Sequence, residues 1–519
     1  MTFNLAVVLR ESARSHPGKP AIVSDEGTLT YAELDQASDV VAANLVAQGI
    51  DPGDAVGLQL PNVSEFAVAL YGIIKTGAVA VPMNVLNKGP EVGFFLTDSR
   101  AQAMITASEC AAEGLRGAEL AGVSKTYVVG SYDAGKAHTR ARSFGELTAP
   151  VSGPAPFVQR QPGDAAILLY TSGTTGKPKG VELTHFQLFM NANAHVDGFE
   201  MDSDTVVIAV MPLFHALGLS GILNATIRTA GTVVLVRRFE ALKVLEAIEK
   251  HRATLLHGVP TMYHALLNHP QAGEFDTTSL QICGSAGAPI ASELLDNFEK
   301  AFEVVILEAY GLTESGPVAT FNRRNHRKPY SIGTPVWGVD VEIWDEHHNQ
   351  LAPGKDHIGE LVIRGHNTMG GYLNNAQATE EAFAGGWLHT GDLGYRDEDG
   401  FFFIVDRKKE MIIRGGYNVY PREVEEVVAE VPGIGEVAVL GVADPDWGQQ
   451  VVAVYTVRDG ADVAPQTVID HCRSRMASYK KPKVAHRVDA FPLNSTGKIA
   501  KRVLRDRLES GLAPDEERV

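Results

Sequence analysis

The chain has 519 residues, more than a single hydrophobic core usually serves, so we expect at least two domains. Apolar residues make up 45% of the sequence and charged residues 21%, as in an ordinary soluble globular protein. The formal net charge of −17 disfavours binding to nucleic acid or to an anionic membrane over the whole surface. The three cysteines form no CxxC pair, which argues against a disulfide framework or a zinc site; they are Cys110, Cys283 and Cys472.

The sequence predicts a cytoplasmic protein without a transmembrane segment. Its first residues lack a basic region and soon reach Glu11, so we expect no signal peptide. The longest apolar runs, such as residues 66–74, are about half as long as a membrane span requires. We expect no nucleic-acid partner. Peripheral contact with a membrane stays open, as does the choice between a monomer and a homodimer.

Helix and strand patterns alternate over the first 330 residues. Thr30 and Glu33 have the spacing of a capping box, which predicts that a helix begins there. A strand, a helix and a second strand are expected between residues 55 and 82. This alternation predicts an α/β fold with parallel sheets that carry helices on both faces. The segment 112–160 is less regular and is expected to lie on the surface.

Residues 170–180 are rich in glycine and hydroxyl groups and follow an apolar strand expected at 165–170. Glycine lets the backbone turn tightly and approach a ligand closely, and successive N–H groups in such a turn bind anions. Hydroxyl groups and two lysines add donors and positive charge, which suits a polyphosphate. The short spacing between Gly173 and Gly176 excludes a Walker A loop. A plain surface loop is the alternative.

Three further stretches suggest ligand binding, and the first and third have a purely structural alternative. Residues 284–289 are small, so a ligand could lie against their backbone, or they form a tight strand-to-helix turn. Residues 310–314 place an aromatic ring, a hydroxyl and a carboxylate at a strand end, where open α/β sheets bind ligands. Residues 390–392 are expected in a turn, where Asp392 either accepts hydrogen bonds from a sugar diol or only holds the turn.

The pattern changes after residue 338. Short strands at 339–344, 359–364 and 401–405, separated by Gly and Asp turns, predict an antiparallel or barrel-like subdomain. The charged run at 406–410 then marks a joint between two apolar strands, and the composition changes after it. A solvated loop is the alternative for that run.

A small α+β domain is expected after the joint. Pro421 suits the first position of a helix, strand-like runs lie between residues 437 and 457, and a basic helix is expected near 496–508. Residues 414–418 could admit a thin ligand over bare glycine backbone, or form a hairpin turn. Lys498 stands at the start of the basic helix, where a solvated lysine is the plain alternative.

In their order and spacing, these stretches resemble the adenylate-forming superfamily, which includes acyl-CoA synthetases, aryl-CoA ligases, amino-acid adenylation domains and luciferases. The resemblance covers essentially the whole chain. It implies an enzyme that joins a carboxylate to ATP, giving acyl-AMP and pyrophosphate, and then passes the acyl group to a thiol, usually that of coenzyme A. ATP, Mg²⁺ and coenzyme A are therefore expected. The motifs that carry it are residues 171–180, 310–314, 390–392, 406–410, Gly415–Gly416 and Gly497–Lys498.

The resemblance also implies a division of labour between domains. Residues 1–405 would form a large N-terminal domain of two helix-flanked β-sheets and the barrel-like subdomain, which binds ATP and the acid. Residues 406–410 would form a hinge, and residues 411–519 a small mobile α+β domain that carries the catalytic lysine. By family position the small domain rotates about Lys409. The rotation would withdraw Lys498 after the first step.

Single residues receive roles from the same resemblance. Lys498 would bridge the carboxylate and the α-phosphate, because the first step joins two anions and needs positive charge in its transition state. Thr313 would contact the α-phosphate, and Glu314 would hold Mg²⁺. The β- and γ-phosphates would lie against Thr171, Ser172, Gly173, Thr174, Thr175 and Lys179. Adenine would lie between Tyr310 and the stretch Gly287, Ala288 and Pro289. The ribose would bind Asp392 and Arg407. The pantetheine arm of coenzyme A would pass Gly415 and Gly416.

The resemblance places the acid pocket at His215 and at residues 258–263, 285–287 and 311–312. His215 occupies the position where amino-acid-activating members carry an aspartate, and residues 259–263 lack the arginine of malonate activators, so both substrate classes are disfavoured. We expect a medium- to long-chain fatty acid, which gains about 0.8 kcal/mol per CH₂ on leaving water. An aryl acid such as a cinnamate or benzoate is the alternative. His215 is a candidate catalytic or gating residue, or it merely packs.

Other functions stay open at this point. The acyl group could pass to a carrier protein, the enzyme could be an oxidative, luciferase-like member, or the chain could bind nucleotide without catalysis. The presence of Lys498, Glu314 and Asp392 argues against the last. The basic cluster at 323–328 could meet coenzyme A phosphates, a membrane or only solvent, and solvent is favoured. Acylation of Lys498 would remove its charge and should stop the first step.

Overall fold

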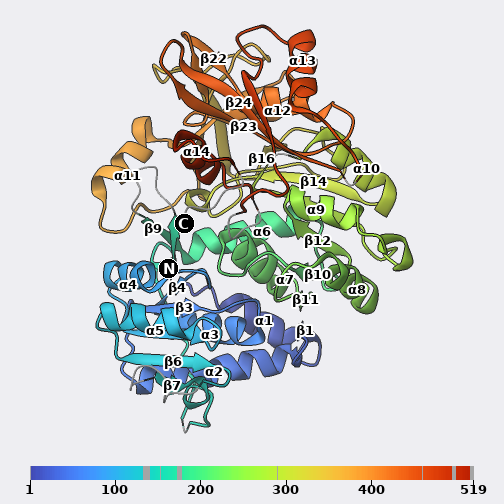
Figure 1. The fold of residues 1–519 in the computed structure, drawn as a ribbon. Coiled ribbons are helices and arrows are strands. Elements are labelled where there is room, and N and C mark those ends of the chain that lie inside the picture. Colours follow the sequence, from blue (N-terminus) through green and yellow to red (C-terminus); the bar gives the residue numbers. More distant parts are fainter. Residues whose placement is uncertain are drawn as a thin grey trace. The chain divides into compact units, whose positions relative to one another are not determined.

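A computed structural model describes residues 2–132, 141–151, 153–171, 178–288, 290–458, 460–493 and 498–514 (Figure 1). The chain forms two compact units. Unit 1 comprises Met1–Val341 and Ile363–Leu388, and unit 2 comprises Glu342–Val362 and His389–Val519. The expected fold class, a mixed α/β chain with large helix-flanked sheets and a small C-terminal α+β region, is confirmed. The predicted domain boundaries and the hinge at 406–410 stay predictions.

Unit 1 contains a seven-stranded sheet. Its strands pair in parallel except for the last two, which form an antiparallel hairpin. In spatial order they are β7 (Ala141–Ser143), β6 (Lys125–Val129), β5 (Ala103–Ala107), β3 (Ala55–Gln59), β4 (Val79–Pro82), β8 (Ala165–Thr171) and β9 (Lys179–Thr184). Both faces of β3 and β5 are buried, as expected for a parallel sheet that helices cover on both sides.

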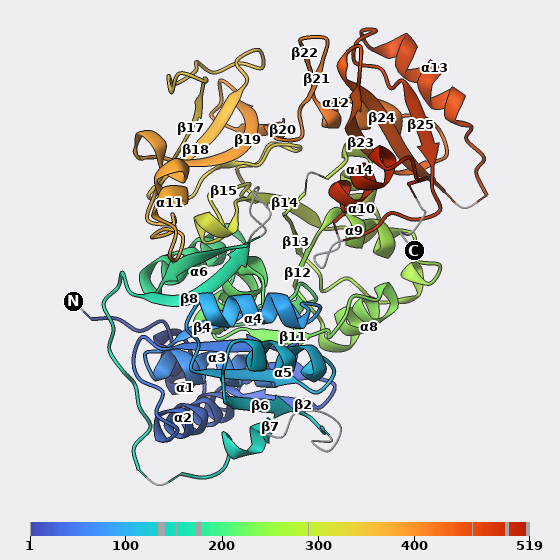
Figure 2. The same ribbon diagram turned by 60° about the vertical axis from the view of Figure 1, so that its left-hand side comes forward.

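Four helices belong to this half of unit 1. They are α2 (Tyr31–Ala47), α3 (Ser64–Lys75), α4 (Gly89–Asp98) and α5 (Ala111–Leu120). Helices α2 and α3 pack together, and so do α4 and α5 (Figure 2). The predicted capping box at Thr30 and Glu33 is present at the start of α2. The buried ammonium group of Lys75 on α3 pairs with Asp35 and Asp39 on α2, each at 2.6 Å, so its charge is compensated.

A nine-stranded sheet forms the second half of unit 1. Its inner strands are parallel, and β2, β15 and β16 at its two edges are antiparallel. In spatial order the strands are β16 (Thr334–Pro335), β15 (Thr320–Phe321), β14 (Val305–Tyr310), β13 (Ile282–Ser285), β12 (Leu255–Gly258), β10 (Val206–Ala209), β11 (Thr232–Leu235), β1 (Pro20–Ser24) and β2 (Gly27–Thr30). Its helices include α1 (Val7–Ser15), α6 (His185–Gly198), α7 (Ala225–Arg228), α8 (Ala241–His251), α9 (Pro260–Leu267) and α10 (Ser292–Phe302).

Two smaller sheets follow in the chain. A four-stranded sheet has the order β17 (Val339–Trp344), β18 (Gly359–Gly365), β19 (Leu388–Arg396) and β20 (Phe402–Arg407), and α11 (Ala376–Ala382) lies between β18 and β19 in sequence. Within unit 2, a five-stranded sheet contains β22 (Tyr417–Val419), β21 (Ile412–Arg414), β24 (Gly448–Val457), β23 (Ile434–Asp444) and β25 (Val484–Arg487). Helices α12 (Pro421–Ala429) and α13 (Pro465–Arg475) pack on it through a buried cluster that includes Val424, Val451 and Val468, and α14 (Lys501–Glu509) contacts β23.

Four local expectations are corrected. Residues 390–392 lie inside strand β19 rather than in a turn, because β20 pairs with that stretch across an irregular register. The first two residues of the predicted joint at 406–410 continue β20. The segment 112–160 is more regular than expected, since β6 and β7 extend the seven-stranded sheet. The basic helix begins at Lys501 rather than near residue 496.

Across the described residues, no helix combines the length and the apolar composition needed to cross a membrane.

Candidate active site

Most of the predicted site residues of unit 1 follow neighbouring parallel strands. Strands β10, β12, β13 and β14 are adjacent and parallel, so their carboxyl ends share one edge of the sheet. The chain segments that leave this edge contain His215, residues 258–263, Ala286–Ala288 and residues 310–314. Ligands bind at this edge of open α/β sheets. The topology therefore brings together stretches that are far apart in sequence.

Glu314 is the centre of a polar cluster at this edge. The hydroxyl of Tyr372 donates to Oε1 of Glu314 at 2.9 Å, and the hydroxyl of Thr171 lies 3.5 Å from the same oxygen. Burial, followed by the charge of Glu314, raises the pKa of Tyr372, so its hydroxyl stays protonated and keeps donating. Thr171 ends β8, so the cluster connects the seven-stranded sheet with the segment after β14.

Tyr372 also contacts the hairpin that carries the predicted phosphate loop. It forms an isolated bridge with Val181 on β9, and the ammonium group of Lys179 lies 4.8 Å from the centre of its ring. Sequence reasoning missed Tyr372. The signal that could have pointed to it is the pair of glycines before it, which allow the backbone to pass close to β9. Thr171, Lys179 and Glu314 are therefore held together through one tyrosine. The predicted phosphate-loop residues Ser172, Gly173, Thr174 and Thr175 lie outside the described residues.

The predicted adenine-binding residues occupy two adjacent strand ends. Tyr310 is the last residue of β14, and Gly287 and Ala288 follow β13 by two and three residues. Gly287 has φ of +83°, a conformation that favours glycine. Thr313 begins a short 3₁₀ helix that contains Glu314. Pro289 lies outside the described residues.

His215 precedes an uncommon π-helix, residues Leu217–Asn224. Its main-chain N–H donates to Pro212, and its ring contacts that of Phe214 at 4.8 Å between centroids. The π-helix packs closely at Gly218, where a Cβ would lie 2.1 Å from the carbonyl oxygen of Pro212. A π-helix often marks a functional site. His215 is thus held on a segment whose backbone departs from a regular α-helix.

Aromatic side chains fill both faces of the sheet below this edge. On one face, Tyr263 is fully buried, donates to the carbonyl of Gly284 at 2.6 Å and packs on Phe298. On the other, His257 packs on Phe199 at 4.6 Å between centroids. Burial lowers the pKa of His257 to about 3, so this imidazole is neutral at neutral pH. Tyr263, which the sequence placed in the acid pocket, is a core residue.

In unit 2, the predicted ribose and carboxylate-activating residues lie together. Nε of Arg407 pairs with Oδ1 of Asp392 at 3.0 Å. Both charges act on Lys498: burial and, to a smaller extent, the charge of Arg407 lower the pKa of this lysine to about 8, against the opposing charge of Asp392. The three residues come from β19, β20 and the segment before α14, and their predicted roles in binding stay predictions.

Lys409 lies in a turn of residues 408–410 that connects β20 with β21. The main-chain N–H groups of Glu410 and Met411 donate to the carbonyl of Arg407, at 2.8 and 3.0 Å. These bonds span Lys409, so a large change in its backbone angles would break them. A turn between two strands is nevertheless the location that a hinge residue needs, and the role of Lys409 as a hinge stays a prediction.

Gly415 and Gly416 form the turn between β21 and β22, with φ of +58° and +82°. A Cβ at Gly415 would lie 2.6 Å from the ring of Trp447, so only glycine fits there. Trp447 is 51% exposed, and Tyr417 beside the turn is 57% exposed and stacks on Tyr479 at 4.7 Å. The family resemblance also brings Tyr417 to the site, but sequence reasoning missed Trp447 and Tyr479. These rings form an aromatic surface that could hold a planar ring next to the glycine turn.

The basic cluster at 323–328 is partly occupied by structural contacts. Arg327 forms a bidentate pair with Glu299, at 2.5 and 2.9 Å, and Arg323 donates to the hydroxyl of Thr334. Arg327 is therefore a packing residue of unit 1 rather than a free cation.

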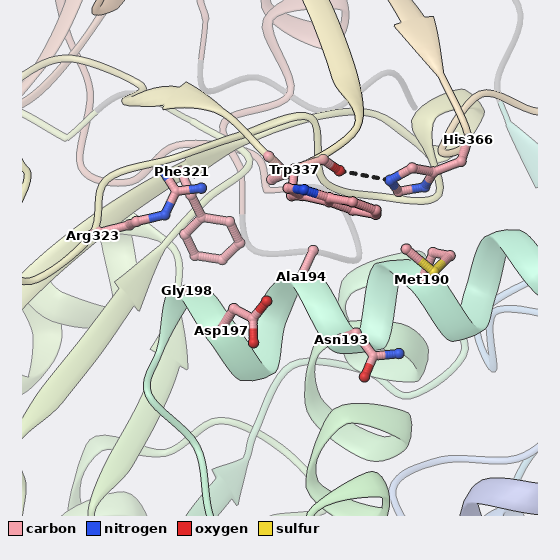
Figure 3. A pocket seen from close by; sticks show the side chains of 10 residues that line it. Met190, Asn193, Ala194, Asp197, Gly198, Phe321, Arg323, Trp337 and His366 are labelled. Atoms are coloured by element: carbon pink, nitrogen blue, oxygen red, sulfur yellow. Dashed lines mark hydrogen bonds between the residues drawn. The ribbon is translucent and has the colours of Figure 1, made fainter.

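A small pocket beside α6 contains none of the predicted site residues (Figure 3). It has a volume of about 50 Å³, which suits a few water molecules but not a nucleotide. Trp337 and His366 form its upper wall, where the ring nitrogen Nε2 of His366 lies 2.8 Å from the carbonyl oxygen of Trp337. We do not place the active site there.

Among the described residues, no group of three or more His, Cys, Asp or Glu side chains could hold a metal ion. A single carboxylate still fits Mg²⁺, because this ion usually takes one or two carboxylates and completes its shell with substrate phosphates and water. Glu314 meets that requirement, since two hydroxyl contacts fix its Oε1 next to the strand that leads into the phosphate loop.

Comparison with known proteins agrees with this geometry. Residues 9–373 match the AMP-binding enzyme family, and residues 423–498 match the AMP-binding enzyme C-terminal domain. A long-chain-fatty-acid–CoA ligase of Bacillus subtilis is 33% identical over 96% of this chain and 94% of its own length. A feruloyl-CoA synthase of Amycolatopsis is 36% identical over 95% of this chain and 97% of its own. The ATP-bound structure of MatB from Rhodopseudomonas palustris superposes with a TM-score of 0.90 at 31% identity, covering 98% of this chain and 99% of that one.

The chain belongs to the AMP-binding enzyme family. The predicted membership of the adenylate-forming superfamily and the predicted class, an acid–thiol ligase, are confirmed.

Proposed function

We propose that this enzyme is an ATP-dependent CoA ligase for apolar monocarboxylic acids, working through acyl-AMP. The observation that carries the proposal is the pair of residue groups that two-step chemistry requires. Unit 1 holds Thr171, Lys179 and Glu314 around Tyr372, and unit 2 holds Lys498 beside Asp392 and Arg407. The relatives are named for acids as different as long-chain fatty acids and ferulate. They therefore support the two-step CoA ligase chemistry and do not select one substrate.

In the first step, the acid carboxylate attacks the α-phosphorus of ATP and pyrophosphate leaves. Lys498 holds its proton and places positive charge between the two reacting anions, where the transition state gains most from it. Lys179 holds the leaving phosphates, and Asp392 with Arg407 holds the ribose. Glu314 would hold Mg²⁺, which neutralises phosphate charge when bound. Tyr310 and the Gly287–Ala288 backbone enclose the adenine.

In the second step, the thiol of coenzyme A attacks the acyl-AMP carbonyl and AMP leaves. The turn at Gly415 and Gly416 gives pantetheine a bare backbone to lie on. The exposed rings of Trp447 and Tyr417 flank that turn, and the guanidinium of Arg414 lies 5.8 Å from the Trp447 ring. Such a surface suits the nucleotide half of coenzyme A, because its flat adenine can stack on an aromatic ring while its negative phosphates lie near the positive charge. Rotation about Lys409 would exchange Lys498 for this turn.

For the acid, we propose a medium- to long-chain fatty acid first and an aryl acid second. The residues at the sheet edge are small or apolar, and charged groups that would bind an amine or a second carboxylate are missing from the stretches 212–215 and 258–263. The buried rings of Tyr263, His257 and Phe199 lie below this edge, and such surroundings suit an apolar or aromatic acid. The same aromatic packing favours an aryl acid as the competitor.

The test is pyrophosphate release from ATP with octanoate, dodecanoate, hexadecanoate and cinnamate, with and without coenzyme A. We expect acid-dependent release, with multiple turnovers only when coenzyme A is present. We expect kcat/KM for the best fatty acid to exceed that for cinnamate at least tenfold, about 1.4 kcal/mol. Release limited to about one equivalent with coenzyme A would point to a carrier-protein acceptor and contradict the CoA ligase. A reversed ratio would make the aryl acid the substrate.

A further inference from the structure

Glu360 on β18 accepts hydrogen bonds from two sides of the predicted ribose site. Its Oε1 accepts from the main-chain N–H of Gly391 at 2.9 Å. Its Oε2 pairs with Nδ1 of His389 at 3.2 Å and with the ammonium group of Lys408 at 3.2 Å. The side chain is only 12% exposed. All four residues belong to unit 2.

The peptide groups on either side of Gly391 are fixed by this arrangement. Its N–H binds Glu360, and its carbonyl accepts the main-chain N–H of Lys408 at 2.9 Å. Gly391 has φ of +72°, a conformation that glycine adopts without strain and that other residues disfavour. Asp392 is the next residue, and its carboxylate direction therefore depends on the Gly391 peptide. The Arg407 guanidinium then holds the same carboxylate from the neighbouring strand.

A buried carboxylate would be costly unless its charge were compensated. Burial by itself would raise the pKa of Glu360, but the hydrogen bond from His389 and the charge of Lys408 outweigh it and lower the pKa to about 2. Glu360 is therefore ionised at neutral pH and accepts all three donors. A hydrogen bond from an N–H group to such a charged acceptor is stronger than one to a neutral acceptor.

We propose that Glu360 is the positioning residue of the ribose site: it holds the Gly391 peptide so that Asp392 faces the ribose hydroxyls, and it ties that peptide to Lys408, the residue before the predicted hinge. The proposal rests on the proposed function in one respect, that Asp392 binds the ribose. Glu360 touches no substrate itself. Its effect on the reaction passes through Asp392.

The test measures recognition of the ribose by binding rather than by turnover. Calorimetric titration with ATP and with 3′-deoxy-ATP gives a ratio of dissociation constants that reports the hydrogen bond from Asp392. We expect the native enzyme to prefer ATP by about tenfold, and Glu360→Ala to lower that preference to twofold or less. Glu360→Gln should keep most of it, because the amide oxygen still accepts the N–H of Gly391.

Three further single variants and one double variant keep the test decisive. Glu360→Asp retains the charge but is one methylene shorter, so it should lose the preference even if Glu360→Ala fails to fold. Glu342→Ala, on the neighbouring strand β17, removes a carboxylate that accepts from Trp344 at 2.7 Å and should leave the ratio unchanged. Asp392→Ala should abolish the preference, and adding Glu360→Asp to it should change nothing more.

The proposal is overturned if Glu360→Asp keeps the native ratio, or if Glu342→Ala lowers the ratio as much. Failure of the proposed function would look different. In that case the acids would give no pyrophosphate release, while the nucleotide ratios of the native enzyme and its variants would still be measurable.

Discussion

The main-chain N–H of Arg422 donates to the carboxylate of Asp406 at 3.1 Å, across the predicted hinge. Asp406 also accepts from the N–H of Arg407 at 2.7 Å, and the guanidinium of Arg422 donates to the carbonyl of Ile404 at 2.7 Å. The end of β20 is thereby connected to the first turn of α12. Burial raises the pKa of Asp406 to about 6, against these hydrogen bonds and the charge of Lys501.

This shift predicts a stability change with pH. Between pH 4 and 6 the folded protein keeps a proton on Asp406 that the unfolded chain has released. The contribution of Asp406 to the free energy of unfolding is therefore full below about pH 4 and is lost as the pH rises through 6. The loss is about 3 kcal/mol at most. Denaturant unfolding at a series of pH values should show this fall in the native enzyme and lack it in Asp406→Asn. Asp399→Asn, at an exposed aspartate before β20, is the matched control; an identical pH profile in Asp406→Asn would contradict the prediction.

Lys498→Ala should abolish acyl-AMP formation but spare thioester formation from supplied acyl-AMP. The reason is that only the first step joins two anions and needs the ammonium group. The two half-reactions are measured separately, as pyrophosphate release and as thioester formation. Lys300→Ala, at an exposed position on α10, controls for the loss of a surface charge. Equal losses in both half-reactions would remove Lys498 from the proposed role.

The lowered pKa of Lys498 makes the first step sensitive to alkaline pH. Because the charged form is active and its pKa is about 8, kcat/KM for acyl-AMP formation should be constant below pH 7 and fall about fivefold between pH 8 and 9. Lys498→Arg keeps its charge in this range, so any remaining activity should not fall there. A fall of the same size in Lys498→Arg would assign the titration to another group.

Lys409→Pro should spare acyl-AMP formation and block the thioester step. Proline fixes φ, so it prevents the backbone change that a hinge at this residue requires. Lys409→Ala removes the same side chain but leaves φ free, and it should support both steps. Both half-reactions are followed as above. Normal overall turnover in Lys409→Pro would show that the chain does not rotate at this residue.

Tyr372→Phe should slow acyl-AMP formation about tenfold. The substitution removes the hydroxyl that donates to Glu314 but keeps the ring beside Lys179, and a hydrogen bond to a charged group contributes about 1.5–3 kcal/mol. The Mg²⁺ concentration for half-maximal pyrophosphate release should rise as well. Tyr330→Phe removes a comparable hydroxyl, which binds Asp296 at the surface at 3.0 Å, and should have little effect. An unchanged Mg²⁺ dependence in Tyr372→Phe would separate Tyr372 from the metal site.

Local patterns predicted most secondary-structure elements. The structure contains three features that depend only on neighbouring residues: the capping box at Thr30, the strand at 339–344 and Pro421 at the first position of α12. The prediction of a turn at 390–392 was wrong, because it too was based only on neighbouring residues. Its Gly and Asp are typical of a turn, but pairing with β20 draws it into a strand, and that pairing is invisible in the local sequence.

Short motifs were enough to identify the family and the kinds of chemical groups present, because the spacings of glycine, hydroxyl, lysine and carboxylate residues can be read along the chain. Which of these groups meet depends on how the sheets assemble. Tyr372 reaches Glu314 and Lys179 because β9 bridges to it, and Glu360 reaches Gly391 and Lys408 because three strands lie side by side. Such contacts join residues far apart in the chain, where no local spacing constrains them, so the supporting residues of the site emerge only when the sheets form.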